Sequence, residues 1–270
     1  MSWYCKRGSI MNELTGRKRG VFLSVIIPAR NEEGSVGETI AALSKTLKDR
    51  DIHHEIIVVD DGSTDGTREV ILEAMKANTE LIYTRNDSRN GFGLAIRKGL
   101  ESYRGDAAVI FMADGSDDPR DIVRYYEKLE EGYDCVFGSR FMRGSKVSDY
   151  PLPKLLLNRA ANTMLNIVFR LDNNDITNAF KCYRREVIEG ISPVLSLHFN
   201  ITVELPLKAA VRGYSYATVP ISWTGRVKGI AKFKIKEMGS RYMFIILYIL
   251  LEKLLSRGDY VRRPRVKKPG

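Results

Sequence analysis

Two groups of carboxylates in this 270-residue chain each follow an apolar segment of strand length. The first group is Asp60 and Asp61. The second begins at Asp114, in the segment 111–119 that reads Phe-Met-Ala-Asp-Gly-Ser-Asp-Asp-Pro. Carboxylates at the carboxyl end of a buried strand are well placed to hold a divalent cation against a diphosphate. An acidic turn that caps a helix is the alternative, since Asp and Ser are favoured there. The two groups together favour nucleotide-sugar chemistry.

Strand-length apolar runs alternate with amphipathic stretches along the first half of the chain. The predicted strands are 22–28, 55–60, 81–84, 107–112 and 134–138, and the predicted helices are 35–48, 67–77, 93–103 and 119–131. This alternation is typical of a mostly parallel α/β sheet with helices on both faces. Ligands of such sheets bind beyond the carboxyl ends of the strands, where 28–32, 60–63 and 113–114 would converge. No Gly-x-Gly-x-x-Gly follows the first strand, so a dinucleotide site loses its main support.

Positive charge is concentrated at the end of the chain. The sequence has a net charge of +10, and residues 226–270 carry 13 Lys or Arg against 3 Asp or Glu, which accounts for the whole excess. A neutral body with a basic end indicates an anionic partner, either a membrane leaflet or nucleic acid. Nucleic acid is disfavoured because the basic segment lacks the interleaved aromatic residues of single-strand binders.

The cysteines and the first residues limit the class of protein. Cys5, Cys135 and Cys182 are scattered and form no Cys-x-x-Cys pair. This argues for a reducing compartment and against a structural zinc site. Residues 1–20 contain no long apolar run, so we expect no secretory signal and interpret them as a poorly ordered lead-in.

The second half of the chain predicts further elements. Residues 152–169 have a helical pattern that puts Arg159 and Asn162 on one face, which is either part of a site or an ordinary solvated face. We also expect a short helix at 201–212 and a strand at 214–223.

The segment 243–251 is apolar on all sides. It has about half of the roughly 20 residues needed to cross a bilayer. Lys and Arg flank it on both sides, which favours a helix in the membrane interface on the anionic cytoplasmic face, with peripheral attachment. The alternative is a buried helix followed by a solvated basic tail. We therefore divide the chain into a lead-in (1–20), a main domain (21–232) and a basic, apolar membrane-interface segment (233–270).

Four motifs carry a family likeness. Residues 25–33, 58–67, 90–95 and 138–141 together resemble the family 2 glycosyltransferases, and most of all their polyprenyl-phosphate (dolichyl-phosphate) mannosyltransferase branch. The resemblance covers about 21–235. It implies a GT-A (Rossmann-like) fold, a nucleotide-sugar donor with GDP-mannose favoured, Mg²⁺ or Mn²⁺, and inversion at the anomeric carbon.

The resemblance also implies a donor site. Residues of four segments would bind the donor: Pro28, Arg30, Asn31, Glu32, Asp60, Asp61, Asn90, Gly91, Gly93 and Ala113. The branch usually reads Asp-Ala-Asp at the metal loop, followed two residues later by Gln. Here Met112 stands at the first Asp and Ser116 at the Gln, so Asp114 with Ser116 would hold the metal. Met is a poor ligand for Mg²⁺ or Mn²⁺, and we expect weaker metal binding.

Cationic residues would hold the two phosphates of the reaction. By resemblance to the branch's Arg-x-x-Gly-x-Ser-Lys loop, Arg226 and Lys232 would hold the donor diphosphate. The acceptor phosphate would meet a second set, namely Arg140, Arg159, Asn162 and Lys228. The residues expected to act in catalysis are Asp114, Arg140 and Arg226. The segment 175–180 resembles the branch's Asp-x-Thr-x-Gly-Phe segment, which shapes the sugar site.

The acceptor decides whether the reaction needs a general base. A sugar hydroxyl would need a positioned carboxylate, for which Glu204 is the later candidate, although a structural role is expected for it. A lipid phosphate is already anionic and needs only cations such as the Arg guanidinium. Two alternatives stay open: the same fold using UDP-glucose, UDP-N-acetylglucosamine or a saccharide acceptor, and a weakly catalytic nucleotide-sugar-binding partner, which Met112 favours. A separate membrane-anchoring subunit is a further possible partner.

Overall fold

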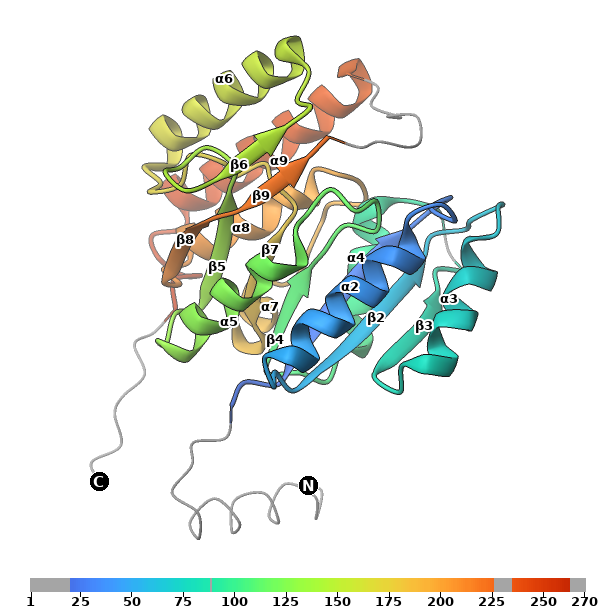
Figure 1. Cartoon of the computed structure of the whole chain (residues 1–270). Helices are drawn as coiled ribbons and strands as arrows, with labels where there is room; N and C mark the ends of the chain where they lie inside the picture. Colours follow the sequence, from blue (N-terminus) through green and yellow to red (C-terminus); the bar gives the residue numbers. More distant parts are fainter. Residues whose placement is uncertain (1–19, 88, 226–234, 263–270) are drawn as a thin grey trace, which may run out of the picture.

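The computed structural model describes residues 20–87, 89–225 and 235–262, and its main element is a seven-stranded sheet (Figure 1). The sheet strands are β1 (Leu23–Ala29), β2 (His54–Asp60), β3 (Leu81–Arg85), β4 (Ala107–Ile110), β5 (Cys135–Ser139), β7 (Lys181–Arg184) and β8 (Tyr216–Pro220). A second sheet pairs β6 (Lys146–Ser148) with β9 (Ser222–Thr224). The helices are α2 (Val36–Asp49), α3 (Thr67–Ala77), α4 (Phe92–Ser102), the 3₁₀ turn η1 (Pro119–Asp121), α5 (Ile122–Glu130), α6 (Leu152–Phe169), α7 (Arg185–Gly190), α8 (Ile201–Val211) and α9 (Ile235–Leu255).

The strand order is β3-β2-β1-β4-β7-β5-β8, and every strand except β7 runs in the same direction. The mostly parallel α/β sheet predicted from the sequence is therefore confirmed. The five predicted strands are present with shifted ends. The predicted strand 107–112 ends at Ile110, although the Phe111 backbone N–H still donates to the carbonyl of Ile26 (3.0 Å).

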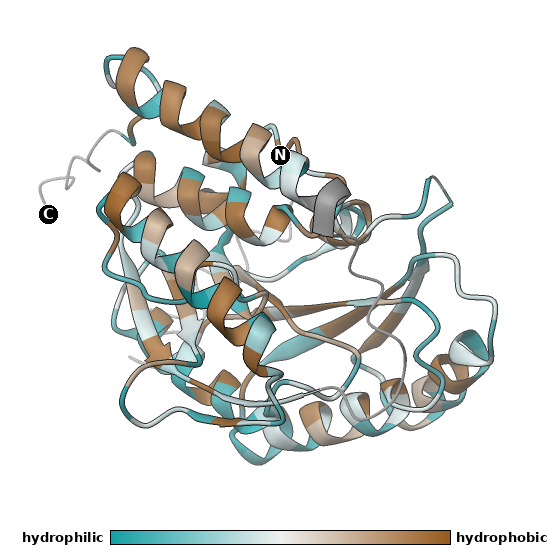
Figure 2. Cartoon of the chain, turned by 90° about the horizontal axis from the view of Figure 1, so that it is seen from above, coloured by the Kyte–Doolittle hydropathy of each residue, from teal (hydrophilic) through white to brown (hydrophobic). Residues whose placement is uncertain are grey.

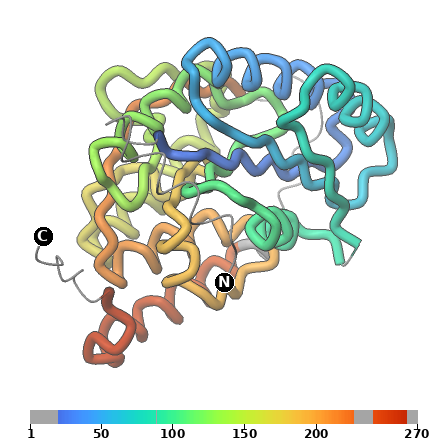
Figure 3. Tube along the Cα trace, turned by 90° about the horizontal axis from the view of Figure 1, so that it is seen from below, coloured from blue at the N-terminus to red at the C-terminus, as the bar shows by residue number. Residues whose placement is uncertain are grey.

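Alternation along β1 explains how helices cover both faces of the sheet. All seven residues of β1 are buried. Val25 and Ile27 belong to the core formed with α2, α3 and α5, whereas Ile26 faces α4. Successive side chains of a strand point to opposite faces, so a strand buried on both sides must be apolar throughout. Seen from below, the N-terminal half of the chain lies beside the C-terminal half (Figure 3).

The predicted strand 214–223 is wrong as a single element. It is divided into β8 and β9, which belong to different sheets. Pro220 lacks the N–H that a continuing ladder would need. Ile221 then donates to the carbonyl of Ser139 (3.1 Å), and Ser222 starts the pairing with β6.

Helix α9 is apolar on most of its surface but packs on α8 through only part of it. Ile245 and Ile249 are buried there, while Phe244 and Leu251 are more than half exposed. Figure 2 shows strongly apolar stretches on this helix, which leads to the C-terminal tail. Among the helices that the structure describes, none combines the length and the apolar character needed to cross a membrane.

Candidate active site

The loops after β1 and β2 are hydrogen-bonded to each other at the carboxyl edge of the sheet. The Asn31 side-chain oxygen accepts from the Thr64 backbone N–H (2.8 Å), and the Glu32 backbone N–H donates to the Thr67 hydroxyl (2.8 Å). Asn31 has a φ of +56°, a conformation that Asn tolerates better than most residues. This arrangement leaves the Arg30 and Asn31 side chains exposed at the rim, whereas Pro28 is buried within β1.

Asp60 and Asp61 at the end of β2 are both buried and have different partners. The Asp60 carboxylate accepts from the Ser63 backbone N–H (2.8 Å) and the Tyr83 hydroxyl (3.0 Å). The Asp61 carboxylate accepts from the Asn86 amide (2.7 Å) and the Gly91 backbone N–H (2.8 Å). Asp61 therefore holds Asn86 and Gly91 in place. Asn90 on that loop is exposed.

Gly91 and Gly93 are packed closely against the chain at 195–198. A Cβ on Gly93 would lie 2.6 Å from the carbonyl oxygen of Ser196, and a Cβ on Gly91 would overlap Leu197. The Gly93 backbone N–H also donates to the Leu197 carbonyl (3.1 Å). Both glycines allow the first turn of α4 to approach the chain at 195–198. Their contact with the donor stays a prediction.

The turn that contains Asp114 is fixed on both sides. The Asp114 carboxylate accepts from the Ser116 backbone N–H (3.1 Å), and Gly115 between them has a φ of +70°. The Ala113 carbonyl accepts from the hydroxyl of Thr39 (3.2 Å). On the other side, the Ser116 carbonyl accepts from the Thr224 N–H (2.9 Å). The turn thus lies beside β9.

Asp117 is the most unusual carboxylate of this turn. It is 3% exposed, and its Oδ2 has no hydrogen-bond partner. Burial, together with the negative charge of Asp114, raises the pKa of Asp117 to about 7. In the described part of the chain, no three His, Cys, Asp or Glu side chains come together as a ready metal site. A hard cation with few protein ligands nevertheless fits the oxygens of Asp114, Ser116 and Asp117, because diphosphate oxygens and water can complete its coordination.

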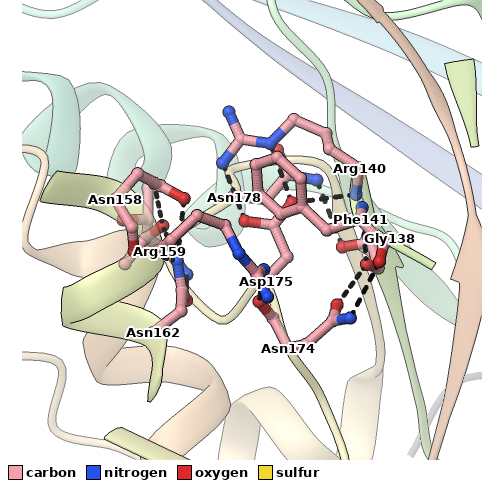
Figure 4. Close-up of polar contacts among 12 residues, drawn as sticks. Gly138, Arg140, Phe141, Asn158, Arg159, Asn162, Asn174, Asp175 and Asn178 are labelled. Atoms are coloured by element: carbon pink, nitrogen blue, oxygen red, sulfur yellow. Dashed lines mark hydrogen bonds and ion pairs between the residues drawn. The ribbon is translucent and has the colours of Figure 1, made fainter. Parts of the chain in front are cut away.

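Arg140 and Asp175 form a buried ion pair at the end of β5 (Figure 4). Arg140 is 9% exposed and Asp175 is fully buried. The Asp175 carboxylate accepts from the Arg140 backbone N–H (2.9 Å), Nε (2.7 Å) and Nη2 (2.7 Å). The guanidinium carbon also lies 5.4–5.5 Å from the ring centroids of Phe141, Tyr150 and Trp223. Two nitrogens of the Arg140 side chain are therefore already occupied by Asp175.

Arg159 lies beside Arg140 at a surface cavity of about 650 Å³. Arg159 on α6 donates from Nη1 to the Asn174 carbonyl (2.9 Å), and its guanidinium carbon lies 4.6 Å from the Phe141 ring centroid. The cavity has a cationic floor, apolar walls and one carboxylate at its exposed rim. It is lined by Arg140, Phe141, Ser145, Val147, Asp149, Tyr150, Leu155 and Arg159.

Asn162 does not line this cavity. It is buried, and its amide donates to Asn158 Oδ1 (3.0 Å) and Thr177 Oγ1 (3.0 Å), while its oxygen accepts from the Thr177 backbone N–H (3.1 Å). Figure 4 shows Asn158 and Asn162 beside the loop that carries Asp175. Asn162 therefore positions this loop, and its contact with the acceptor stays a prediction.

The role of Glu204 is structural, as expected. Its buried carboxylate pairs with Lys208 (2.7 Å) and accepts from the backbone N–H groups of Leu195 (2.7 Å) and Ser196 (2.6 Å). A carboxylate with these partners is not placed to act as a general base.

Several residues of the site were not identified from the sequence. Lys181 is fully buried, with Nζ donating to the carbonyls of Asn178 and Thr202, and burial lowers its pKa to about 7. Asp175 and Asn174 hold the two arginines. The only signal in the sequence was that Asp175 begins a motif of the family.

Three predicted residues lie outside the described residues: Arg226, Lys228 and Lys232. Gly225, which immediately precedes Arg226, donates from its backbone N–H to the Ser148 carbonyl (2.9 Å). Gly225 thus lies next to Ser148, one residue before the cavity residue Asp149.

The characterised proteins that resemble this chain include two that are more than 30% identical to it. The chain is 32% identical over 238 residues to the polyprenol monophosphomannose synthase of Mycolicibacterium smegmatis, which covers 80% of this chain and 86% of that protein. It is 31% identical over 209 residues to glycosyltransferase AglD of Haloferax volcanii. That match covers 76% of this chain but only 33% of AglD, so the chain spans about a third of that relative.

Solved structures share the fold at lower identity. Glucosyl-3-phosphoglycerate synthase from Mycobacterium tuberculosis in complex with UDP superposes with a TM-score of 0.65 at 20% identity, over 90% of this chain and 83% of that chain. Its complex with Mn²⁺, UDP and glucosyl-3-phosphoglycerate gives a TM-score of 0.64 at 20% identity, with the same coverage. This likeness confirms the predicted GT-A fold.

A family model supplies the assignment. The model described as glycosyl transferase family 2 matches residues 24–192, which is more than half of the chain. The matched region contains the Asp60–Asp61 pair, the Asp114 turn and the Arg140–Asp175 pair. The protein therefore belongs to glycosyl transferase family 2 and is a glycosyltransferase.

Proposed function

We propose that this glycosyltransferase moves a sugar, with GDP-mannose as the favoured donor, onto the phosphate of a polyprenyl lipid at a membrane surface. The observation that carries the proposal is the cavity between Arg140 and Arg159, which combines a cationic floor with apolar walls. A phosphate attached to a hydrocarbon chain has this same combination of charge and apolar surface. The mannose-transferring relative, at 32% identity, supports this choice of acceptor and sugar.

The reaction requires that the negative charges of the two phosphate groups are neutralised, and it does not require a general base. One oxygen of the lipid phosphate forms the new bond to the anomeric carbon while the bond from that carbon to the donor diphosphate breaks. The electron pair of the broken bond leaves with the nucleoside diphosphate, and no proton has to move. Among the described residues, the later candidate for a base, Glu204, is buried in an ion pair, which agrees with a phosphate acceptor.

Arg159 and Arg140 would have different roles in binding the acceptor phosphate. Arg159 is only partly buried, so its guanidinium is accessible to the phosphate from the cavity. Arg140 is held by Asp175 at two nitrogens, which fixes the plane of its guanidinium against the cavity. An Arg fork fixed before binding loses less entropy when it meets a phosphate.

The leaving diphosphate would be bound at the turn that contains Asp114. Asp114 and Ser116 would hold a divalent cation there, and solved structures of the same fold have been obtained with Mn²⁺ and with Mg²⁺. When bound, such a cation neutralises charge that develops on the diphosphate. Arg226 and Lys232, in the segment that follows Gly225, are proposed to add positive charge to the same group.

Membrane attachment is proposed through both α6 and α9. Exposed apolar side chains of α6 begin beside the cavity: Leu152, Leu156, Leu157, Met164 and Ile167. The two helices meet at their C-terminal ends, where Lys253 of α9 donates to the Phe169 carbonyl (2.9 Å). An exposed apolar face with nearby lysine and arginine fits the interface of an anionic leaflet. We propose peripheral attachment at the cytoplasmic face through these helices and the basic end of the chain, directly or with a membrane subunit.

The test is sugar transfer with a panel of donors. Radiolabelled GDP-mannose, UDP-glucose and UDP-N-acetylglucosamine are each incubated with polyprenyl phosphate and Mn²⁺ or Mg²⁺, and the label in the organic extract is counted. We expect a lipid product with GDP-mannose and a large loss in Arg159→Gln. The exposed Arg143, which does not line the cavity, provides the matched control Arg143→Gln, which should keep its activity. No lipid product with any donor would refute the proposal.

UDP-glucose is the second candidate donor. The specific observation in its favour is that several solved structures of this fold were obtained with UDP, and one with UDP-glucose. A lipid product with UDP-glucose alone would change the donor and leave the acceptor assignment intact. Binding of a donor without any transfer would instead support the non-catalytic partner that Met112 favours.

A further inference from the structure

Asp117 has a carboxylate oxygen with no partner, although it lies inside the protein. Its Oδ2 is buried and accepts no hydrogen bond, and the side chain is 3% exposed. The neighbouring acids on the same loop are satisfied differently. Asp118 pairs with Arg120 (2.6 Å), and Asp121 pairs with Arg124 (2.6 Å) and accepts from the Ser222 backbone N–H (2.5 Å). A buried carboxylate oxygen without a donor or cation is costly, so its retention calls for a partner.

The backbone of the turn holds Asp117 toward Asp114. Gly115 in the left-handed region reverses the chain between the two residues. Asp117 then pairs with Trp223 in an antiparallel bridge, which fixes its position against β9. The negative charge of Asp114 acts on the Asp117 carboxylate. Two carboxylates that repel each other in a partly buried turn are stabilised by a cation between them.

The carboxylate of Asp117 also lies beside the backbone of Met112. The Met112 backbone N–H donates a hydrogen bond to it. The family resemblance implies an aspartate of the metal loop at position 112, whereas Met112 offers only a thioether, which is a poor ligand for a hard cation. The Asp117 side chain thus supplies an oxygen ligand beside the position at which the resemblance implies one.

We propose that Asp117 and Asp114 together hold the divalent cation, so that a carboxylate five residues later along the chain replaces the one missing at position 112. This inference rests on the proposed function, because that function requires a cation beside the diphosphate. It assigns Asp117 a role as a ligand, with Ser116 between the two aspartates as a third oxygen.

The test is direct binding of Mn²⁺, measured by electron paramagnetic resonance of the free ion, with the full chain alone and with GDP added. We expect Asp117→Asn to weaken Mn²⁺ binding by about tenfold or more, the scale on which losses around metal sites are felt. Asp118→Asn is the matched control, since Asp118 has its own partner in Arg120, and it should bind as the parent does. Met112→Asp should tighten binding and should restore it in Asp117→Asn.

Thermal unfolding separates a ligand from a structural residue. In metal-free buffer, Asp117→Asn should melt at the parent temperature or above it, because the substitution removes a buried negative charge without a partner. Added Mn²⁺ should raise the melting temperature of the parent and of Asp118→Asn, but not that of Asp117→Asn.

Asp114→Asn distinguishes the failure of this inference from the failure of the proposed function. If Asp114→Asn weakens Mn²⁺ binding while Asp117→Asn does not, the role of Asp117 is refuted and the metal at Asp114 stands. If neither substitution changes Mn²⁺ binding, the cation is not held at this turn and the proposed mechanism fails with the inference.

Discussion

The ion pair between Arg140 and Asp175 predicts a large loss of stability in Asp175→Asn. The substitution keeps the size of the side chain and removes its charge. Asp175 is fully buried and accepts three hydrogen bonds from Arg140, at 2.7, 2.7 and 2.9 Å. Removing one partner of a buried pair leaves the other charge uncompensated, and such changes cost about 3–5 kcal/mol.

Loss of a proton from Lys181 would reduce the destabilisation caused by Asp175→Asn. The Asp175 charge raises the pKa of Lys181, which burial lowers to about 7 overall. Without Asp175 the pKa of Lys181 falls further, so its ammonium can lose a proton instead of remaining as a second buried cation. We therefore expect the free energy of unfolding to fall by about 3 kcal/mol, at the lower end of the range.

Urea unfolding followed by circular dichroism measures the effect. Asp172→Asn is the matched control, because Asp172 is exposed and lies three residues away on the same loop. The double substitution Arg140→Met with Asp175→Leu should recover part of the loss, since it removes both buried charges. A change below about 1 kcal/mol in Asp175→Asn would refute the view that this pair fixes Arg140.

Three further predictions test the scaffold around the site. Burial by itself would raise the pKa of Glu55, but hydrogen bonds from Ser24 and Arg104 outweigh burial and lower the pKa below its ordinary 4.5. The Glu55 charge therefore stabilises the fold above pH 4.5 and less as pH falls, so Glu55→Gln should lose about 2 kcal/mol in urea unfolding at pH 7 and less at pH 3. Gly62→Ala should lower the free energy of unfolding by about 1–2 kcal/mol, because the residue has a φ of +73° and its Cβ would lie 2.8 Å from a side-chain oxygen; an unchanged melting temperature would contradict this. Glu204→Gln should lower the melting temperature while the remaining folded protein keeps its turnover number, and a loss of turnover without a loss of stability would make Glu204 a base after all.

Local patterns in the sequence determined the parallel part of the sheet and the edge at which the site lies. Strand β1 is apolar at every position, which is typical of a strand covered on both faces. Asp60 ends such a strand and Asp114 follows another, so their place at the carboxyl edge follows from the order of the elements alone. Helices α3 and α6 were also predicted with the bounds that the structure shows, because their periodic patterns are long.

The reversed strand β7 and the partners within the site were decided by the tertiary structure. Strand β7 has four residues, Lys-Cys-Tyr-Arg, whose pattern indicates neither a strand nor its direction. Arg140 and Asp175 lie 35 residues apart, and the pattern around each is compatible with an exposed charge. Gly93 was assigned to the donor by its motif, and the motif gave no sign that the chain at 196–198 packs against it. Hydrophobic periodicity predicts whether a segment is a helix or a strand and which of its faces is buried. The partner of a buried charge depends instead on which distant segment the fold packs against it.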